Sequence, residues 1–170
     1  MKIILQKTWD GLAISPSEFV SVHFYYGDTH SNIEIKSPYY NNEAPPEPMQ
    51  SLWRLWEFEV VEIFFVGDNQ LYTELEFGPH GHYLGLQLDG PRNIIKKHIP
   101  VEYKAEIDND FWTGLATVEN AYLPEEIKRI NCFAIHNCEN SRRYLSYTRL
   151  PGEKPDFHQP DLFPFLEDLC

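Results

Sequence analysis

The chain has 170 residues, of which 42% are hydrophobic and 15% aromatic. A chain of this length and apolar content folds around one core rather than remaining disordered. Its 26 acidic and 14 basic residues leave a net charge of −12, and that field repels nucleic acid and anionic membrane surfaces. The composition therefore predicts a single domain over residues 1–170 and argues against nucleic acid and membranes as partners.

Cysteine usage and the N-terminus indicate the compartment. Cys132, Cys138 and Cys170 have no zinc-ligand spacing, and any intramolecular pairing leaves one of them unpaired. The apolar run Ile3–Leu5 is too short for the core of a signal peptide, and no later stretch has the length of a membrane span. We expect a cytoplasmic protein; a monomer is expected, although the sequence leaves the oligomeric state open.

The first half of the chain reads as short strands separated by turns. Val20–Tyr26 alternates apolar and polar residues with the period of two that a half-buried strand requires, and Ile33–Ile35 repeats this briefly. Residues Asn41–Gln50 contain three prolines and form a predicted surface loop. Glu59–Val66 and Leu71–Phe77 then form a predicted hairpin.

The second half continues the same pattern. Further strands are predicted over His82–Leu88, Val101–Ile107, Phe111–Glu119, Asn131–Asn137 and Tyr144–Thr148. Short helices are expected at Leu123–Glu126, where proline is followed by acids, and around Leu162–Leu166, where Pro164 interrupts.

Strand number and spacing favour one fold class. About nine short strands without the spacing of βαβ units predict an all-β, antiparallel β-sandwich of jelly-roll or immunoglobulin-like type, with one or two short helices. Residues 151–170 are expected to form a C-terminal tail packed on the sandwich.

Several segments resemble a known family in their order along the chain. The segment Leu55–Phe65 resembles the signature strand of family-nine carbohydrate-binding modules and related DOMON-like sandwiches. Tyr72–Gly81 looks like the tyrosine-acid strand of that family and its Pro-x-Gly turn. Trp112–Ala116, Leu123-Pro124 and Asn131–Ala134 resemble the segments that follow. The resemblance implies a carbohydrate-binding-module-like fold, and it implies calcium as an optional ligand.

A second resemblance spans nearly the whole chain. Thr8–Gly11, Pro79–Gly81, Phe133–His136 and Lys154–His158 are similar to segments of an uncharacterised eukaryotic protein family. This likeness implies a shared fold and a shared site without supplying an activity.

Residue types suited to sugar binding occur throughout the chain. A sugar needs rings to cover its apolar face and polar groups to bond its hydroxyls. The ring candidates are Trp53, Trp56, Tyr83, Trp112 and Tyr144, and the residues that could supply polar contacts are Glu74, Gln87, Asn93, Arg142 and Arg143. Among the rings, Trp56 is predicted to be a core residue and Trp53 a more exposed one. The candidate ligand-binding residues are Trp53, Glu74, His80, His82, Tyr83, Asn93, His136, Arg143, Tyr144, Asp156 and His158.

Four glutamates lie on the predicted central hairpin: Glu59, Glu62, Glu74 and Glu76. They could hold calcium through hard oxygen ligands, or act as the acid and base of a hydrolase. A solvated sheet face with local ion pairs is the reading we favour. No cofactor is expected from the residues themselves.

The leading hypothesis is a non-catalytic binding domain for a carbohydrate or another small polar ligand. One alternative is a hydrolase-like enzyme that uses a loop-borne pocket of His80, His136, Arg143, Asp156 and His158. The other alternative is an intracellular protein-interaction scaffold. No phosphate loop, dinucleotide fingerprint or nucleophile elbow occurs in the sequence.

Overall fold

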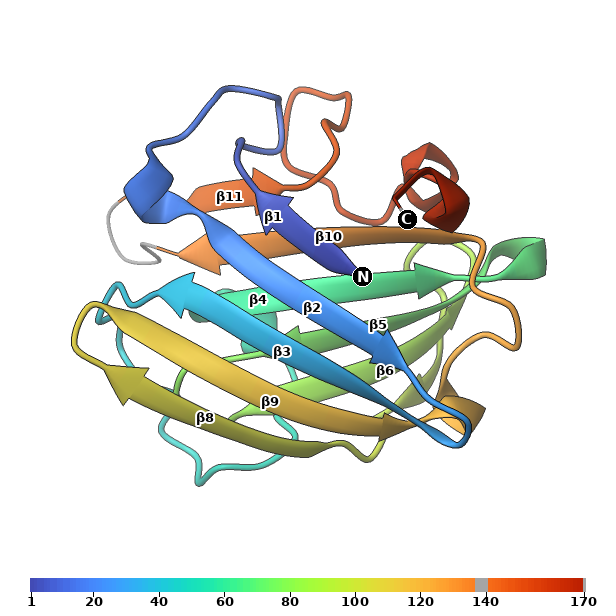
Figure 1. Cartoon of the computed structure of the whole chain (residues 1–170), viewed down its shortest axis with the longest axis horizontal. Coiled ribbons are helices and arrows are strands. Elements are labelled where there is room, and N and C mark those ends of the chain that lie inside the picture. The colour runs from blue at the N-terminus through green and yellow to red at the C-terminus, as the bar shows by residue number, and fades with distance from the viewer. Residues whose placement is uncertain (137–140, 170) are drawn as a thin grey trace.

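Two antiparallel β-sheets pack face to face in the computed structural model, which describes residues 1–136 and 141–169 (Figure 1). The five-stranded sheet has the order β1-β2-β3-β9-β8, and the six-stranded sheet has the order β11-β10-β4-β5-β6-β7. The strands are β1 (Lys2–Leu5), β2 (Val20–Tyr26), β3 (His30–Pro38), β4 (Val60–Val66), β5 (Leu71–Phe77), β6 (Tyr83–Asp89), β7 (Ile94–Lys97), β8 (Glu102–Asp108), β9 (Phe111–Glu119), β10 (Arg129–His136) and β11 (Arg143–Ser146).

The sandwich core lies between the two sheets and follows from strand alternation. Val20, Val22 and Phe24 of β2 and Ile63 and Phe65 of β4 contribute to it. Val22 pairs with Ile35 and Phe24 with Ile33 across the β2–β3 ladder, so matched apolar residues share one face. Trp112 on β9 is fully buried in this core.

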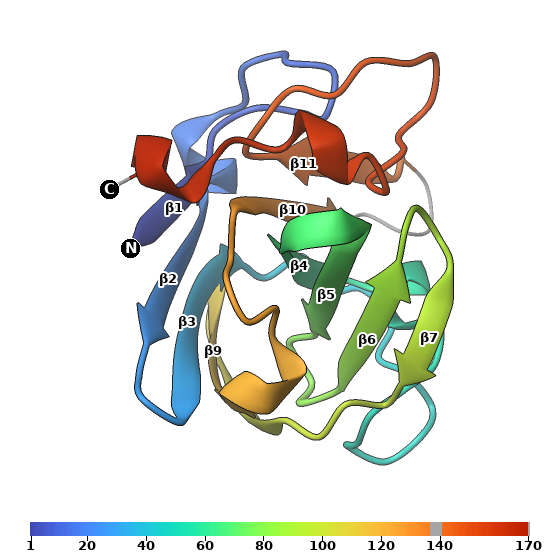
Figure 2. The same ribbon diagram turned by 90° about the vertical axis from the view of Figure 1, so that its right-hand side faces the viewer.

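A second apolar cluster lies on the other face of the six-stranded sheet. Phe64 of β4, Tyr72 of β5 and Phe133 of β10 belong to it, together with Phe157 and Phe163 from the C-terminal segment. The rings of Phe133 and Phe157 stack at 4.0 Å. The C-terminal segment lies against β10 and β11 (Figure 2), so this sheet has no face that is wholly open to water.

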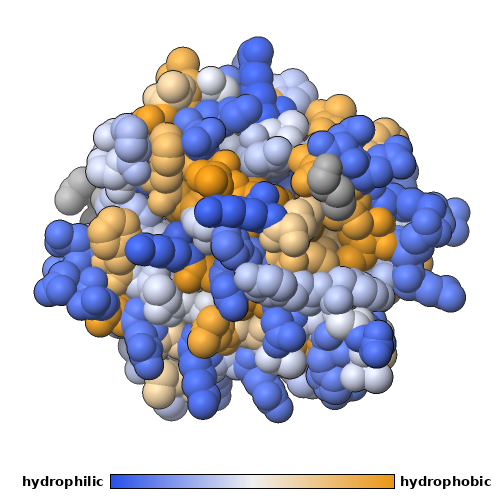
Figure 3. Space-filling view, viewed as in Figure 1, coloured by the Kyte–Doolittle hydropathy of each residue, from blue (hydrophilic) through white to orange (hydrophobic). Residues whose placement is uncertain are grey.

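The five-stranded sheet, by contrast, exposes its outer face. Tyr25 of β2 and Phe111 and Leu115 of β9 are each more than two-fifths exposed. Hydrophilic side chains separate the apolar ones across this view (Figure 3). The two sheets therefore differ: one outer face is solvated and the other is covered.

The predicted antiparallel β-sandwich is confirmed, and the differences are local. Strands β1 and β7 are not predicted from the sequence. Strand β1 has only four residues, and three of the four residues of β7 are exposed, so neither shows a clear alternation of apolar and polar residues. Within the described residues the only helices are 3-10 turns: η1 (Pro16–Glu18), η2 (Leu55–Glu57), η3 (Asp68–Gln70), η4 (Asn120–Tyr122), η5 (Pro160–Leu162) and η6 (Leu166–Leu169).

Both helix positions predicted from the sequence are wrong in detail. The turn expected at Leu123–Glu126 lies one turn earlier, at η4, since the Leu123 amide closes it by donating to the Asn120 carbonyl. The helix expected at Leu162–Leu166 is replaced by η5 and η6 on either side of Pro164, which cannot donate a backbone bond. The predicted strand end at Asn137, together with Cys138 and Cys170, lies outside the described residues.

Candidate functional site

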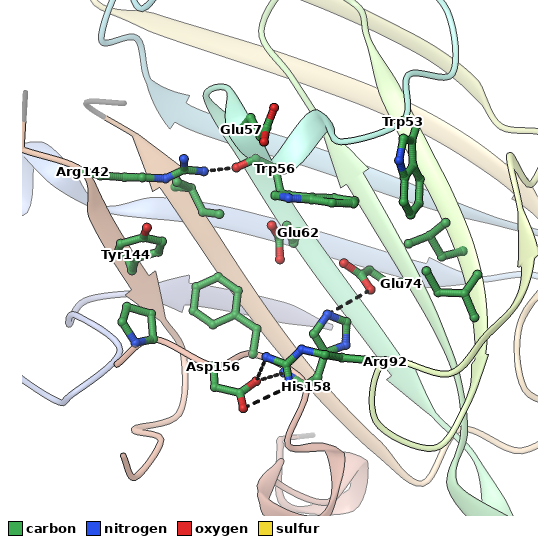
Figure 4. A pocket seen from close by; sticks show the side chains of 15 residues that line it. Trp53, Trp56, Glu57, Glu62, Glu74, Arg92, Arg142, Tyr144, Asp156 and His158 are labelled. Carbon is green, nitrogen blue, oxygen red and sulfur yellow. Dashed lines mark hydrogen bonds and ion pairs between the residues drawn. The ribbon is translucent and has the colours of Figure 1, made fainter. Parts of the chain in front are cut away.

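A pocket of about 530 Å³ opens on the outer face of the six-stranded sheet (Figure 4). Strands β4, β5, β6 and β10 form its floor. The segment before β4 contributes Trp53 and Trp56, the β6–β7 turn contributes Arg92, and the C-terminal segment contributes Asp156 and His158. Chain segments far apart in sequence thus build one cavity.

The pocket floor contains buried carboxyl groups. Glu62 on β4 pairs with Glu76 on β5, and Phe64 pairs with Glu74 one step along the same ladder. Glu62 and Glu74 line the cavity although they are only 2% and 4% exposed, and Glu76 beside them is fully buried. The favoured prediction of a solvated glutamate face is therefore wrong, because the C-terminal segment and the segment before β4 cover this face.

Burial shifts the ionisation of these carboxyl groups. Loss of hydration raises the pKa of Glu62 to about 8, although the Arg142 guanidinium opposes the rise. Burial, and then the neighbouring Glu62 carboxyl, hold the pKa values of Glu74 and Glu76 well above the usual range. Oε2 of Glu74 has no hydrogen-bond partner among the described residues. Burial in the pocket therefore favours the protonated form of all three carboxyl groups.

Two tryptophans form an aromatic wall above this floor. Their rings meet edge to face, with centroids 4.9 Å apart and an angle of 85°. Leu55 between them is fully buried and anchors η2, while the Leu52 amide donates to the Tyr83 carbonyl at 2.8 Å and ties the segment to β6. The Arg142 guanidinium donates to the Trp56 carbonyl. In Figure 4 the Trp56 ring lies above Glu62, and Trp53 stands to one side.

A hydrogen-bonded network closes the other side of the pocket. The Arg92 guanidinium donates to both oxygens of Asp156, at 2.7 and 3.3 Å. The Arg92 backbone amide donates to the Tyr72 hydroxyl at 3.2 Å. Arg92 holds a left-handed backbone (φ 60°), which costs a non-glycine residue about 1 kcal/mol. This network fixes the C-terminal segment over the pocket.

The network also sets the protonation of His158. Because the Tyr72 oxygen accepts from Arg92, its hydrogen is available for Nδ1 of His158, which lies 2.7 Å away. Burial, and then the Arg92 charge, lower the pKa of His158 to about 4. The ring is therefore neutral at pH 7, and its Nε2 lies 4.0 Å from Oε2 of Glu74.

The pocket brings together five of the predicted candidates. Trp53, Glu74, Tyr144, Asp156 and His158 all line it. Trp53 is 36% exposed, and Lys97 Nζ lies 3.6 Å from its ring centroid on one side.

The other six candidates do not line this pocket. His82 is buried and contacts the Glu47 carbonyl at 2.8 Å, and the Tyr83 ring packs against Tyr103. Asn93 is exposed in the β6–β7 turn. The remaining three are His80, His136 and Arg143.

His80, His136 and Arg143 lie around a neighbouring tyrosine pair instead. The His136 ring stacks on Tyr40 at 3.8 Å, and the His80 ring meets Tyr39 edge to face at 5.9 Å. Arg143 pairs with Glu18 at 2.8 Å. The alternative enzyme site needed these three groups beside His158, and the structure does not bring them together with it.

Sequence reasoning missed three features of the pocket. Trp56 lines the pocket and is not a core residue, whereas Trp112 is the buried tryptophan of the core. No binding role is predicted for Arg92 from the sequence. The one feature of the sequence that marks this position is the Asp89-Gly90-Pro91 turn that precedes it. The sequence suggests Glu62 as a calcium ligand or an acid–base group but not as a sugar-binding residue, because its burial in the pocket depends on distant segments.

Two further observations bear on ligands. Within residues 1–136 and 141–169, no group of three or more His, Cys, Asp or Glu side chains is placed to hold a metal ion. In the same range no helix has the length and apolar character needed to cross a bilayer.

Curated relatives cover almost the whole chain. A mouse protein named UPF0462 protein C4orf33 homolog is 35% identical over 175 residues, spanning 97% of this chain and 91% of the relative. The human UPF0462 protein C4orf33 is 33% identical and covers 96% of this chain and 86% of its own length. The chain belongs to the UPF0462 family. No protein-family model matches it.

Solved structures share the fold at low sequence identity. A Bacteroides uniformis protein described as a "putative carbohydrate-binding protein" superposes with a TM-score of 0.72 at 16% identity, over 97% of this chain and 84% of that one. A family-nine carbohydrate-binding module from Caldicellulosiruptor kristjanssonii, in complex with glucose, superposes with a TM-score of 0.52 at 10% identity, over 84% of this chain and 72% of that one. These likenesses establish the carbohydrate-binding-module-like fold of the UPF0462 chain.

Proposed function

We propose that this chain is a non-catalytic binding domain whose outer-face pocket takes a small carbohydrate. The observation that carries the proposal is the placement of the Trp56 ring above the buried carboxyl groups of Glu62 and Glu74 (Figure 4). One wall is thus flat and apolar, and the floor is polar and shielded from water.

The two surfaces of the pocket match the two surfaces of a sugar. An indole face covers the C–H groups on one side of a pyranose ring, and it excludes water from the contact. Protonated carboxyl groups both donate and accept hydrogen bonds, as sugar hydroxyls do. Because burial favours their neutral forms, Glu62 and Glu74 can form hydrogen bonds with sugar hydroxyl groups without the cost of removing a charged carboxylate from water.

The pocket is also preformed. The pair Arg92–Asp156 and the bond between Tyr72 and His158 hold the C-terminal segment over the sheet. A preformed site binds without the entropic cost of ordering a loop. A fold neighbour described as being in complex with glucose supports the choice of a sugar as the ligand class.

Calorimetric titration of the protein with glucose, galactose, mannose and cellobiose tests the proposal. We expect at least one of these sugars to bind, and Trp56→Ala to weaken its binding at least tenfold. Phe111→Ala is the matched control, because this exposed ring lies on β9 in the opposite sheet. Equal affinity in the Trp56→Ala variant would place the ligand elsewhere, and no binding of any sugar would refute the proposal.

A further inference from the structure

Acidic groups outnumber basic ones among the ionisable residues that line the pocket. Arg92 is already paired with Asp156 through two hydrogen bonds. Glu57 at the rim is paired with Arg54. The remaining ionisable groups at the cavity are one guanidinium and three carboxyl groups whose protonated forms burial favours: Arg142, Glu62, Glu74, and Glu76 behind them. Arg142 alone cannot balance two or three of these carboxyl groups in their ionised forms, so the pocket has room for an additional positive charge.

Glu74 directs an unused acceptor into the cavity. The residue is 96% buried, and its Oε2 has no hydrogen-bond partner among the described residues. The group facing it is Nε2 of His158 at 4.0 Å, and that ring is neutral, so it supplies no counter-charge. A buried acceptor without a partner is costly, and a donor carried by a ligand removes the cost.

The walls above the carboxyl groups are aromatic. The rings of Trp53, Trp56 and Tyr144 line the cavity, and an aromatic face attracts a cation placed within about 6 Å of its centroid. Two of these rings already attract cations, since Lys97 Nζ lies 3.6 Å from the Trp53 centroid and Arg142 lies 5.5 Å from that of Tyr144. A cavity of about 530 Å³ with such walls fits an organic cation.

We infer that the pocket selects a ligand that carries a protonated amine, with the ammonium group between Trp56 and the carboxyl groups of Glu62 and Glu74. If the proposed carbohydrate function holds, the ligand is an amino sugar, which binds in preference to its neutral counterpart. The charge of the whole chain, −12, attracts such a ligand and repels anionic ones.

Binding of an ammonium group must displace protons. In the free pocket, burial favours the protonated forms of Glu62 and Glu74. An ammonium group favours their ionised forms, so binding releases a proton, and the affinity for an amine that stays protonated in this range, such as ethanolamine, rises with pH towards 8. The titratable and charged groups that face these carboxyl groups are Glu76 and Tyr72 on β5, Asp156 and His158 in the C-terminal segment, Arg92 in the β6–β7 turn, Glu57 in η2, and Arg142 before β11.

Calorimetry with four probes at pH 7 tests the inference: glucose, glucosamine, N-acetylglucosamine and ethanolamine. Each titration is run in phosphate and in HEPES, two buffers that carry no primary ammonium group and whose ionisation enthalpies differ, so that proton release appears as a difference in measured heat. We expect glucosamine to bind at least tenfold more tightly than glucose or N-acetylglucosamine, with release of a proton that glucose does not cause.

The probes separate failure of this inference from failure of the proposed function. Equal affinity for glucose and glucosamine overturns the ammonium inference and leaves carbohydrate binding intact. If ethanolamine binds and no sugar binds, the result supports the ammonium site and refutes the proposed carbohydrate-binding function. If none of the four probes binds, both the ammonium inference and the proposed carbohydrate function are refuted.

Variants locate the ammonium site. Glu74→Gln keeps the shape of a protonated carboxyl but cannot ionise, so it should remove the preference for glucosamine and the proton release. Glu59→Gln is the matched control, because Glu59 is buried to a similar degree but bonds Asn42 and the Tyr40 amide outside the pocket. An unchanged preference in Glu74→Gln, with normal folding by circular dichroism, would contradict the inference.

Discussion

The Tyr72 hydroxyl on β5 lies 2.7 Å from Nδ1 of His158, which follows it by 86 residues. The same hydroxyl accepts a hydrogen bond from the Arg92 amide. One buried oxygen thus joins the sheet, the β6–β7 turn and the C-terminal segment, which are three of the elements that enclose the pocket.

The Tyr72→Phe variant removes both of these hydrogen bonds and leaves the ring in place. We expect the free energy of unfolding to fall by about 1–2 kcal/mol, and the amides of residues 156–158 to exchange faster with solvent. Urea denaturation and hydrogen exchange measure these effects. Tyr26→Phe, at a ring that is 57% exposed, should change neither quantity; unchanged exchange in Tyr72→Phe would mean that the bond does not hold the segment.

The neutral state of His158 makes stability depend on pH. Its pKa is lowered from 6.5 to about 4 in the folded protein, so between these values the unfolded state binds more protons. Stability therefore falls as the pH drops from 6.5 to 4, by at most about 1.4 kcal/mol per pH unit for one group. His136 acts in the same direction, since burial also lowers its pKa to about 4. Urea denaturation from pH 4 to 7 should show a shallower slope in His158→Gln; an identical slope would refute this assignment.

Ionisation of Glu62 makes stability depend on pH in the opposite direction. Its pKa is raised from 4.5 to about 8 in the folded protein, so the folded state keeps a proton that the unfolded state loses. The stability that this group contributes is present below pH 4.5 and is lost as the pH rises towards 8. Glu62→Gln cannot ionise, so its stability relative to the wild type should increase across this range. Glu102→Gln, at an exposed position on β8, should show no such trend; a constant difference for Glu62→Gln would contradict the burial of a protonated carboxyl.

Replacement of single tryptophans separates core from pocket. Trp112 is fully buried between the sheets, so Trp112→Ala should cost about 3–5 kcal/mol of unfolding free energy. Trp56 is only partly buried and lines the cavity, so Trp56→Ala should cost less than half as much. Denaturation curves measure both values, and equal losses would mean that Trp56 is a core residue after all.

Strand alternation was sufficient to predict the sandwich but not every strand. Val20–Tyr26 has one buried and one open face, so its period of two is visible in the sequence. Strand β4 is buried on both faces over all seven residues. It therefore shows no alternation, and only its residue composition and the turn that follows predict a strand there. Strand β7 is largely exposed at a sheet edge, and no buried stripe marks it.

The pocket was harder to predict because distant segments complete it. Alternation correctly placed Tyr72, Glu74 and Glu76 on one face of β5, yet whether that face was covered depended on residues 151–170. The direction of Trp56 depends on η2, a single turn whose preceding residue, Arg54, has a left-handed backbone (φ 68°). Neither the covering of this face nor the direction of Trp56 produces a periodic pattern in the sequence.

Titration of an isotopically labelled sample, with the four tryptophan indole N–H signals followed by NMR, tests the central claim most directly. Addition of glucosamine should shift the Trp56 signal, and the Trp53 signal beside it, while the Trp112 signal stays fixed in the sandwich core. An unmoved Trp56 signal at saturating ligand, or a Trp112 shift of equal size, would contradict a carbohydrate-binding pocket on the outer face of the six-stranded sheet.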